Sequence, residues 1–299
     1  MLFRSLDSYS LCPGGTGKRI KFCCKDLVPQ LQQLERMIEG EQNTAALQQV
    51  ERQLQETPDR ACLLSLRAML LRMVDKLDEH GAAAALFVEK HPTNPMALAE
   101  QAMALAAEPG RAREAMESLE RAIAASGEGL SGRVYEAMDA VAHALLEQGQ
   151  VVAARALLLL QTAVHQEDQH PLEMVLQLNA SPAIPLLLKD DTILDVAPEG
   201  AAWKPAFDAA MQTIAAGQWL SAAEQLAALT EREPGEPAIW RNLATLRMWL
   251  ADSTAAVEAL HRLAALPVPL EDAAEAEATA LFMSADPLGD EVDQLLASY

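Results

Sequence analysis

The stretch of sequence that decides the fold is GQWLSAAEQLAALTEREPGEPAIWRNLATLRMWLA, residues 217–251. Gly217 is followed five residues later by Ala222, and a second pair with this spacing occupies positions 251 and 256, a period of about 34 residues. Between the two pairs, EPGEP at 233–237 interrupts the helical pattern. Stacked helical hairpins are indicated when a small residue, an alanine and a proline break recur at a fixed period.

The same spacing also occurs earlier in the chain. Gly149 and Ala154 precede the first quoted pair by two such periods. Gly110 and Ala115 lie slightly more than one period further upstream, and HPTNP at 91–95 resembles the break at 233–237. The intervening segments read as helices of about 12–18 residues separated by short polar or Gly/Pro breaks.

This pattern resembles the tetratricopeptide repeat, in which a small residue turns helix A into helix B, an alanine packs between them and a proline ends helix B. The resemblance covers most of residues 41–267 and is closest in the last two units. It implies an all-α fold, a tetratricopeptide-like α-solenoid of about five to seven hairpins in a right-handed superhelix. Residues 170–202 interrupt it with four prolines, which predicts a distorted hairpin or an ordered extended segment there.

In tetratricopeptide arrays the groove lined by the A helices binds peptides. By repeat position, Arg241, Thr245 and Met248 are expected to point into this groove. The resemblance therefore predicts a protein or peptide partner for these three side chains.

Composition supports a helical fold and narrows the classes of partner. Hydrophobic residues make up 51% of the chain but aromatic residues only 4%, so the apolar mass is largely Ala and Leu, which favours close-packed helices over a β-sandwich. The net charge of −20 disfavours nonspecific binding to nucleic acid or anionic membrane. The sequence contains no run of eighteen apolar residues, which a membrane-spanning helix would require. Four cysteines without a secretion signal favour a soluble, cytoplasmic protein.

Near the N-terminus, CPGGTGKRIKFCC at residues 12–24 holds three of the four cysteines. Thiols cluster this closely when a metal ion or a disulfide holds them, and a disulfide is less favoured in a chain without a secretion signal. Gly15 and Gly17 can adopt the positive φ angles that a tight loop around an ion requires.

The run resembles the SEC-C motif, a zinc knuckle best known from the C-terminal tail of the bacterial preprotein-translocase motor. The resemblance implies zinc bound by Cys12, Cys23 and Cys24, whereas Gly14 stands where the motif has its second cysteine. A structural zinc site normally has four protein ligands. Two nearby carboxylates, Asp7 and Asp26, are candidates for the fourth position, and Cys62 is the only other thiol but lies in a helical stretch more than thirty residues away.

We therefore predict two parts, a SEC-C-like knuckle over residues 1–26 and a repeat array over residues 27–299. The knuckle is basic, and its cations are expected to meet an acidic partner surface: Lys18, Arg19, Lys21 and Lys25. These features favour a non-enzymatic protein-interaction scaffold. Two alternatives stay open: a structural array with a vestigial, metal-free knuckle, and a zinc-dependent hydrolase with an open three-cysteine site, which would need a general base and a substrate cavity.

Overall fold

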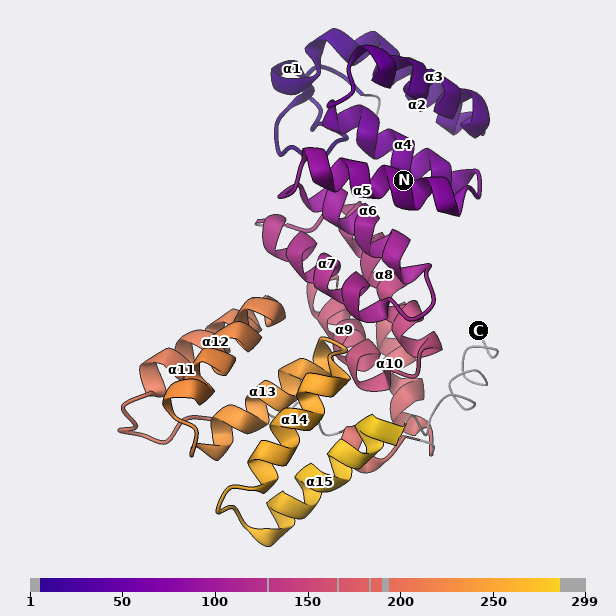
Figure 1. The fold of residues 1–299 in the computed structure, drawn as a ribbon. Coiled ribbons are helices and arrows are strands. Elements are labelled where there is room, and N and C mark those ends of the chain that lie inside the picture. Colours follow the sequence, from indigo (N-terminus) through magenta and orange to yellow (C-terminus); the bar gives the residue numbers. More distant parts are fainter. Residues whose placement is uncertain (1–5, 128, 166, 183, 190–193, 286–299) are drawn as a thin grey trace. The chain divides into compact units, whose positions relative to one another are not determined.

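The computed structural model describes residues 6–127, 129–165, 167–182, 184–189 and 194–285. These residues form helices in succession and no β-strand, with one isolated antiparallel bridge between Leu11 and Arg19 (Figure 1). The predicted all-α fold is therefore confirmed over the described ranges. The chain divides into two compact units: residues 1–108 with 121–137 form unit 1, and residues 109–120 with 138–299 form unit 2.

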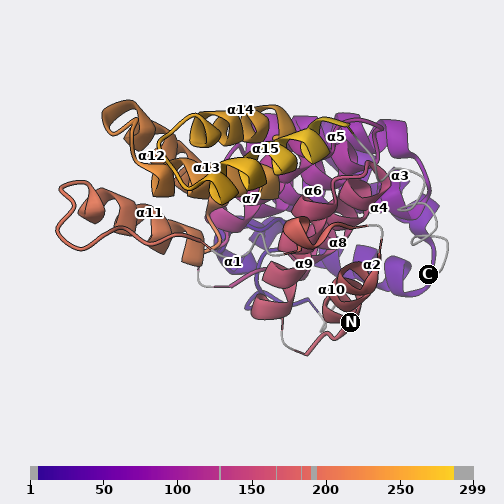
Figure 2. The same cartoon turned by 90° about the horizontal axis from the view of Figure 1, so that it is seen from below.

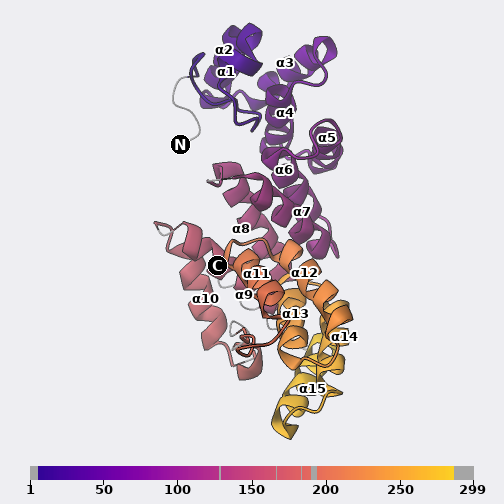
Figure 3. The ribbon, with the colours of Figure 1, turned by 90° about the vertical axis from the view of Figure 1, so that its left-hand side faces the viewer.

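In unit 1 a short helix and a 3-10 turn are followed by helices that pack against one another in chain order (Figures 1 and 3). The elements are α1 Ile20–Cys23, the 3-10 turn Lys25–Leu27, α2 Val28–Glu39, α3 Asn43–Glu56, α4 Ala61–Met73, α5 Leu77–Lys90 and α6 Pro95–Ala106. Two further helices, α7 Ala112–Ala125 and α8 Gly132–Glu147, contribute residues to both units.

In unit 2 the helices α11 to α15 also pack in chain order, and α13, α14 and α15 lie side by side in Figures 1 and 2. The elements are α9 Val151–Val164, α10 His170–Ala180, the 3-10 turn Leu186–Leu188, α11 Lys204–Ala215, α12 Trp219–Arg232, α13 Pro237–Trp249, α14 Ser253–Ala264 and α15 Leu270–Ala285. Helix α9 packs against both α10 and α13.

A residue in the left-handed backbone conformation separates the helices of several hairpins. Gly217 between α11 and α12 has φ of 71°, and Ala251 between α13 and α14 has φ of 57°. The same conformation occurs at Glu41 between α2 and α3, and again one repeat period later at Asp75 between α4 and α5. The hairpin turn is therefore defined by its backbone conformation, and four different residue types adopt it.

In its described residues, the irregular segment predicted at 170–202 contains α10, the 3-10 turn Leu186–Leu188 and an extended stretch. That stretch is fixed to α13 by paired hydrogen bonds: Asp195 N donates to Asn242 Oδ1 at 2.8 Å, and Asn242 Nδ2 donates to Asp195 O at 3.0 Å. Asn242 is fully buried, so its amide satisfies the extended backbone inside unit 2. Residues 183 and 190–193 of the predicted segment lie outside the described residues.

The apolar core of unit 1 does not stop at residue 26. Side chains from the N-terminal segment, including Leu6 and Ile20, share one buried cluster with Leu31 and Leu34 of α2 and Leu63 of α4. The predicted segments 1–26 and 27–299 therefore meet in a common core within this unit.

Candidate metal centre and its surroundings

The loop that carries Cys12 is folded back on itself by backbone hydrogen bonds. Cys12 N donates to Lys18 O at 2.8 Å, and Ile20 N donates to Ser10 O at 2.9 Å. Between them Gly15 and Gly17 both have φ of 67°, a conformation that residues with a side chain rarely adopt. This tight turn brings Cys12 beside the end of α1, where the next two cysteines lie.

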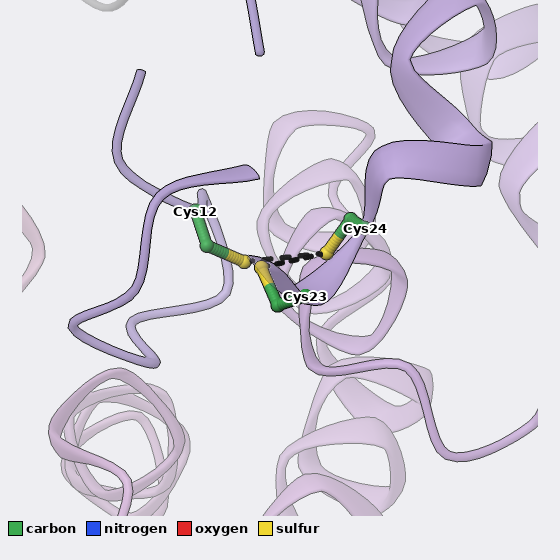
Figure 4. Close-up of side chains that lie close together, drawn as sticks. All are labelled: Cys12, Cys23 and Cys24. Carbon is green, nitrogen blue, oxygen red and sulfur yellow. Dashed lines mark hydrogen bonds between the residues drawn. The ribbon is translucent and has the colours of Figure 1, made fainter. Parts of the chain in front are cut away.

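The three predicted cysteine ligands converge, as Figure 4 shows. Their sulfur atoms all lie within 4.8 Å of one another. Cys12 Sγ is 3.5 Å from Cys24 Sγ, which is in turn 3.3 Å from Cys23 Sγ. Sulfurs bound at about 2.3 Å to one tetrahedral zinc ion would be about 3.8 Å apart. The three side chains therefore fit one metal ion with small adjustments.

Backbone groups and neighbouring thiols set the protonation of the cluster. The thiols of Cys24 and Cys62, together with the Gly14 amide 3.4 Å from Cys12 Sγ, lower the pKa of Cys12. Hydrogen bonding to Cys12 in turn raises the pKa of Cys24, and burial raises that of Cys23. Without a cation, ionisation is thus easier at Cys12 than at Cys23 or Cys24. A divalent ion supplies the charge that lets the others ionise, and its binding releases protons.

Gly14, the residue in place of the second motif cysteine, lies directly against the first turn of α4. A Cβ atom at this position would be 2.4 Å from both Ala61 C and Cys62 N. On its other side Asn94 Nδ2 donates to Gly14 O at 2.7 Å. The Asn94 side chain also accepts from the first amides of α6, at Met96 and Ala97. The cysteine loop is therefore held between the N-terminal ends of α4 and α6.

The two carboxylates considered as oxygen ligands are engaged elsewhere. Asp7 accepts hydrogen bonds from the amides of Tyr9 and Ser10 at 2.7 and 2.8 Å, and these bonds lower its pKa. Asp26 forms an ion pair of 2.7 Å with Arg60. Among the described residues, neither belongs to the group of side chains that could hold the metal.

From the sequence, Cys62 is not expected at the metal site because more than thirty residues separate it from the other cysteines. In the structure it lies in the same core as Cys12 and Cys24 and interacts with the thiols of both. It is the second residue of α4, is fully buried, and belongs to the same core cluster as Cys12 and Cys24. Interaction with the Cys12 thiol raises the pKa of Cys62. The one hint available in the sequence was that a fourth cysteine exists where a fourth ligand is missing.

The predicted basic residues lie at the end of the cysteine loop and just after it, with Lys21 on α1 and Lys25 in the 3-10 turn. Lys18, Arg19 and Lys25 are exposed, and Lys21 is half-buried with its Nζ 4.3 Å from the ring centre of Tyr9 and 4.9 Å from that of Phe22. Large apolar side chains are also exposed here: Tyr9 at 62%, Leu11 at 70% and Phe22 at 70%. We call these seven residues the knuckle patch.

A cavity of about 620 Å³ adjoins the knuckle inside unit 1. Its walls come from the cysteine loop, from α4 and α6, and from residues 126–136, and they include Leu11, Leu66, Met69, Met96, Arg133 and Glu136. Apolar side chains with a few charged groups are typical of sites that bind small molecules or peptide side chains.

The charged wall of the cavity is held by a buried carboxylate, Glu100 on α6. Its Oε2 lies 2.9 Å from His80 Nε2 and 3.2 Å from Arg72 Nε, and its Oε1 lies 3.1 Å from Arg133 Nε. Burial alone would raise the pKa of Glu100. The hydrogen bond from His80 and the charges of Arg133 and Arg72 outweigh burial, so the pKa is lowered and the carboxylate stays ionised. Arg133 is thereby fixed at the cavity wall.

The three groove residues predicted in unit 2 do not form an open surface there. Arg241 pairs with Asp195 at 3.4 Å and with Asp272 at 2.9 Å. Thr245 and Met248 are buried within the unit, at 6% and 5% exposure.

Comparisons with known proteins give no further guide to the site. No protein-family model, no curated protein and no solved structure matches this chain. Among the described residues, no helix combines the length and the hydropathy required to cross a bilayer.

Proposed function

We propose that this protein is a non-enzymatic interaction scaffold, a tetratricopeptide-like helical array whose SEC-C-like N-terminal knuckle binds zinc and presents a docking surface to an acidic protein partner. The observation that carries the proposal is the convergence of Cys12, Cys23 and Cys24, which lie in the same N-terminal segment as the knuckle patch (Figure 4). A metal ion at this point would hold together the loop and α1, and the exposed cations and aromatic rings lie on and beside these two elements.

The repeat assignment is supported by the backbone. Left-handed turn residues occur at Glu41 and Asp75, and again at Gly217 and Ala251. Within each pair the separation equals the tetratricopeptide period of about 34 residues. The assignment extends the resemblance from the last two units to the first two hairpins, where the sequence lacks the small residue at the turn.

The chemistry of the knuckle patch favours a partner with acidic and apolar side chains. Its four cations stand on a chain whose net charge is −20, so the patch differs in sign from the rest of the chain. Exposed aromatic and aliphatic side chains supply the apolar contact that binding of a peptide requires, and the adjoining cavity offers space for one anchoring side chain.

The inference that the protein is not an enzyme rests on the composition of the cysteine group. Within the described residues, the group contains no carboxylate or imidazole that could act as a general base. Zinc-dependent hydrolysis by the wild-type protein that is lost in Cys23→Ser would overturn this inference.

The docking surface is tested by selecting peptides from a displayed library against the purified full chain and measuring their dissociation constants. We expect the selected peptides to be acidic and to lose at least about tenfold in affinity when Lys18 and Arg19 are both changed to Glu, with a weaker effect of the change at high salt. The matched control reverses two exposed arginines of unit 1 outside the patch, Arg36 and Arg52. Equal losses in both variants, or none in either, would refute the proposed surface.

Zinc content is measured on the same preparation. About one zinc per chain is expected for the wild type and none for Cys23→Ser/Cys24→Ser. A metal-free wild type would favour the alternative of a vestigial knuckle.

A further inference from the structure

We propose that Cys62 is the fourth ligand of the metal, so that Cys12, Cys23, Cys24 and Cys62 form a closed four-thiolate site. This inference rests on the metal-binding role proposed above and identifies the ligand that the knuckle itself lacks. It assigns a function to a cysteine that lies on α4, outside the SEC-C-like motif.

The first step is the position of Gly14. At this residue the loop approaches the backbone of α4 so closely that a Cβ atom would lie 2.4 Å from Cys62 N. A cysteine at position 14 therefore cannot be accommodated, because the space for its side chain is filled by the first turn of α4. The residue at that turn is itself a cysteine. The same close approach therefore leaves no room for a side chain at position 14 and brings the backbone of Cys62 against the cysteine loop.

The second step is the surroundings of Cys62. The side chain is fully buried and shares a core cluster with Cys12 and Cys24. It also acts directly on the thiols of both residues. Three sulfurs supply only three of the four positions around a tetrahedral ion, and the Cys62 thiol interacts with two of the residues that provide them.

The third step is charge. Cys62 is the second residue of α4, so the positive end of the helix dipole lies beside the site. Arg60 lies at the start of the same helix and donates from Nη1 to Cys23 O at 2.6 Å. Four thiolates around a divalent cation carry a net charge of −2, and these groups partly offset it.

The ligand set also determines the class of metal and its role. Four thiolates select zinc or a similar soft or borderline cation and exclude magnesium and calcium, which prefer oxygen ligands. A site closed by four protein ligands has no position for a reactive water, so its role is structural. The metal would then connect the N-terminal loop, α1 and α4.

Some movement accompanies binding. Cys62 is not among the three sulfurs that all lie within 4.8 Å of one another. Sulfurs that share a tetrahedral zinc ion are about 3.8 Å apart, so we expect the side chains of Cys62 and Cys23 to rotate towards the ion.

The decisive measurement counts sulfur atoms around the metal. The full chain is loaded with zinc and examined by X-ray absorption at the zinc edge, for the wild type and for Cys62→Ser. We expect four sulfurs at about 2.3 Å in the wild type and three in the variant. The zinc affinity of Cys62→Ser, measured by chelator competition, should fall by more than about 100-fold, which is the upper range for losing a merely supporting group.

Two controls separate ligand loss from disturbance of the core. Cys23→Ser removes one of the three cysteines whose sulfurs already converge, and its zinc affinity should fall by a similar factor. Ala68→Ser places a hydroxyl at another fully buried position of α4 and should leave zinc affinity unchanged.

The outcomes distinguish the two proposals. A wild type without stoichiometric zinc refutes the metal-binding role itself. A wild type that binds zinc through three sulfurs, or a Cys62→Ser variant with wild-type affinity, refutes only the assignment of Cys62. Should Cys62→Ser fail to fold, the sulfur count of the wild type still decides.

Discussion

Replacing Gly14 with alanine tests the close contact between the cysteine loop and α4. The added methyl group would lie 2.4 Å from Ala61 C and Cys62 N, whereas ordinary van der Waals contact begins at about 3.4 Å. Both neighbours are backbone atoms at the start of a helix, so no side chain can rotate to make room. About 1 Å of separation must therefore come from movement of the loop or of the helix end.

The expected cost follows from the rigidity of the neighbours. Overfilling a close-packed region typically costs about 1–3 kcal/mol. If the loop stays in place in the metal-free protein, the cost lowers the free energy of unfolding of unit 1. If the loop moves away from α4, the cost must be overcome when zinc draws the cysteines together, and zinc affinity falls by about 5- to 150-fold.

Both quantities are measured on one pair of variants. Urea unfolding with and without zinc gives the stability, and chelator competition gives the affinity. The control is Gly81→Ala in α5, where a Cβ atom would meet nothing within 4 Å. This control should gain roughly 0.5–1 kcal/mol, because alanine favours a helix interior.

The two effects of Gly14→Ala should together amount to at least about 1 kcal/mol. If stability and zinc affinity both match the wild type, the loop does not rest on α4 as described. The geometric reason for placing Cys62 at the metal would then be lost.

Three further perturbations test other parts of the structure. Burial raises the pKa of Glu120 to about 7, although the amides of Leu220 and Trp219 donate hydrogen bonds to its carboxylate. The folded chain therefore binds this proton more tightly than the unfolded chain does. The free energy of unfolding should fall by about 3 kcal/mol as pH rises from 4.5 to 7. Urea unfolding across this range should show the loss in the wild type and a much flatter profile in Glu120→Gln; equal profiles would contradict the buried carboxyl. Asn94→Ala removes the cap of α6 and the bond to Gly14 O, and should lower the free energy of unfolding by about 0.5–2 kcal/mol; a loss without any change in zinc affinity would show that the loop is held by α4 alone. Chelation of zinc should lower the melting temperature of the wild type and leave that of Cys23→Ser/Cys24→Ser unchanged, and a shift of equal size in both would indicate a second metal site.

The helical fold and the cysteine cluster could be predicted from sequence because both are local patterns. The helices are indicated by apolar residues that recur every three or four positions and by breaks at glycine and proline. The cysteine cluster is indicated because Cys12, Cys23 and Cys24 lie within thirteen residues of sequence. The hairpin turns at Glu41 and Asp75 lack the glycine that usually marks a left-handed residue, so their backbone conformation could not be predicted from the sequence.

Contacts between distant segments could not be predicted in this way. Cys62 comes close to the other cysteines because the start of α4 packs against Gly14. This is a tertiary contact, and no spacing of residues in the sequence predicts it. Repeat position alone placed Thr245 and Met248 in a groove, but both are buried inside unit 2, where α13 packs against α9, α12 and α14. Pairing of Asp195 with Asn242 likewise joins segments that are distant in the sequence.

The common core of the N-terminal segment and the first helices means that the knuckle also serves as an end cap. In a stacked array each hairpin covers its neighbour, so the outermost one requires a cover of a different kind. Leu6 and Ile20 contribute to that cover for Leu31 and Leu34 of α2. Removal of residues 1–26 would therefore uncover an apolar face at the start of the array, and the excised segment would lose the helix wall against which its loop is shaped.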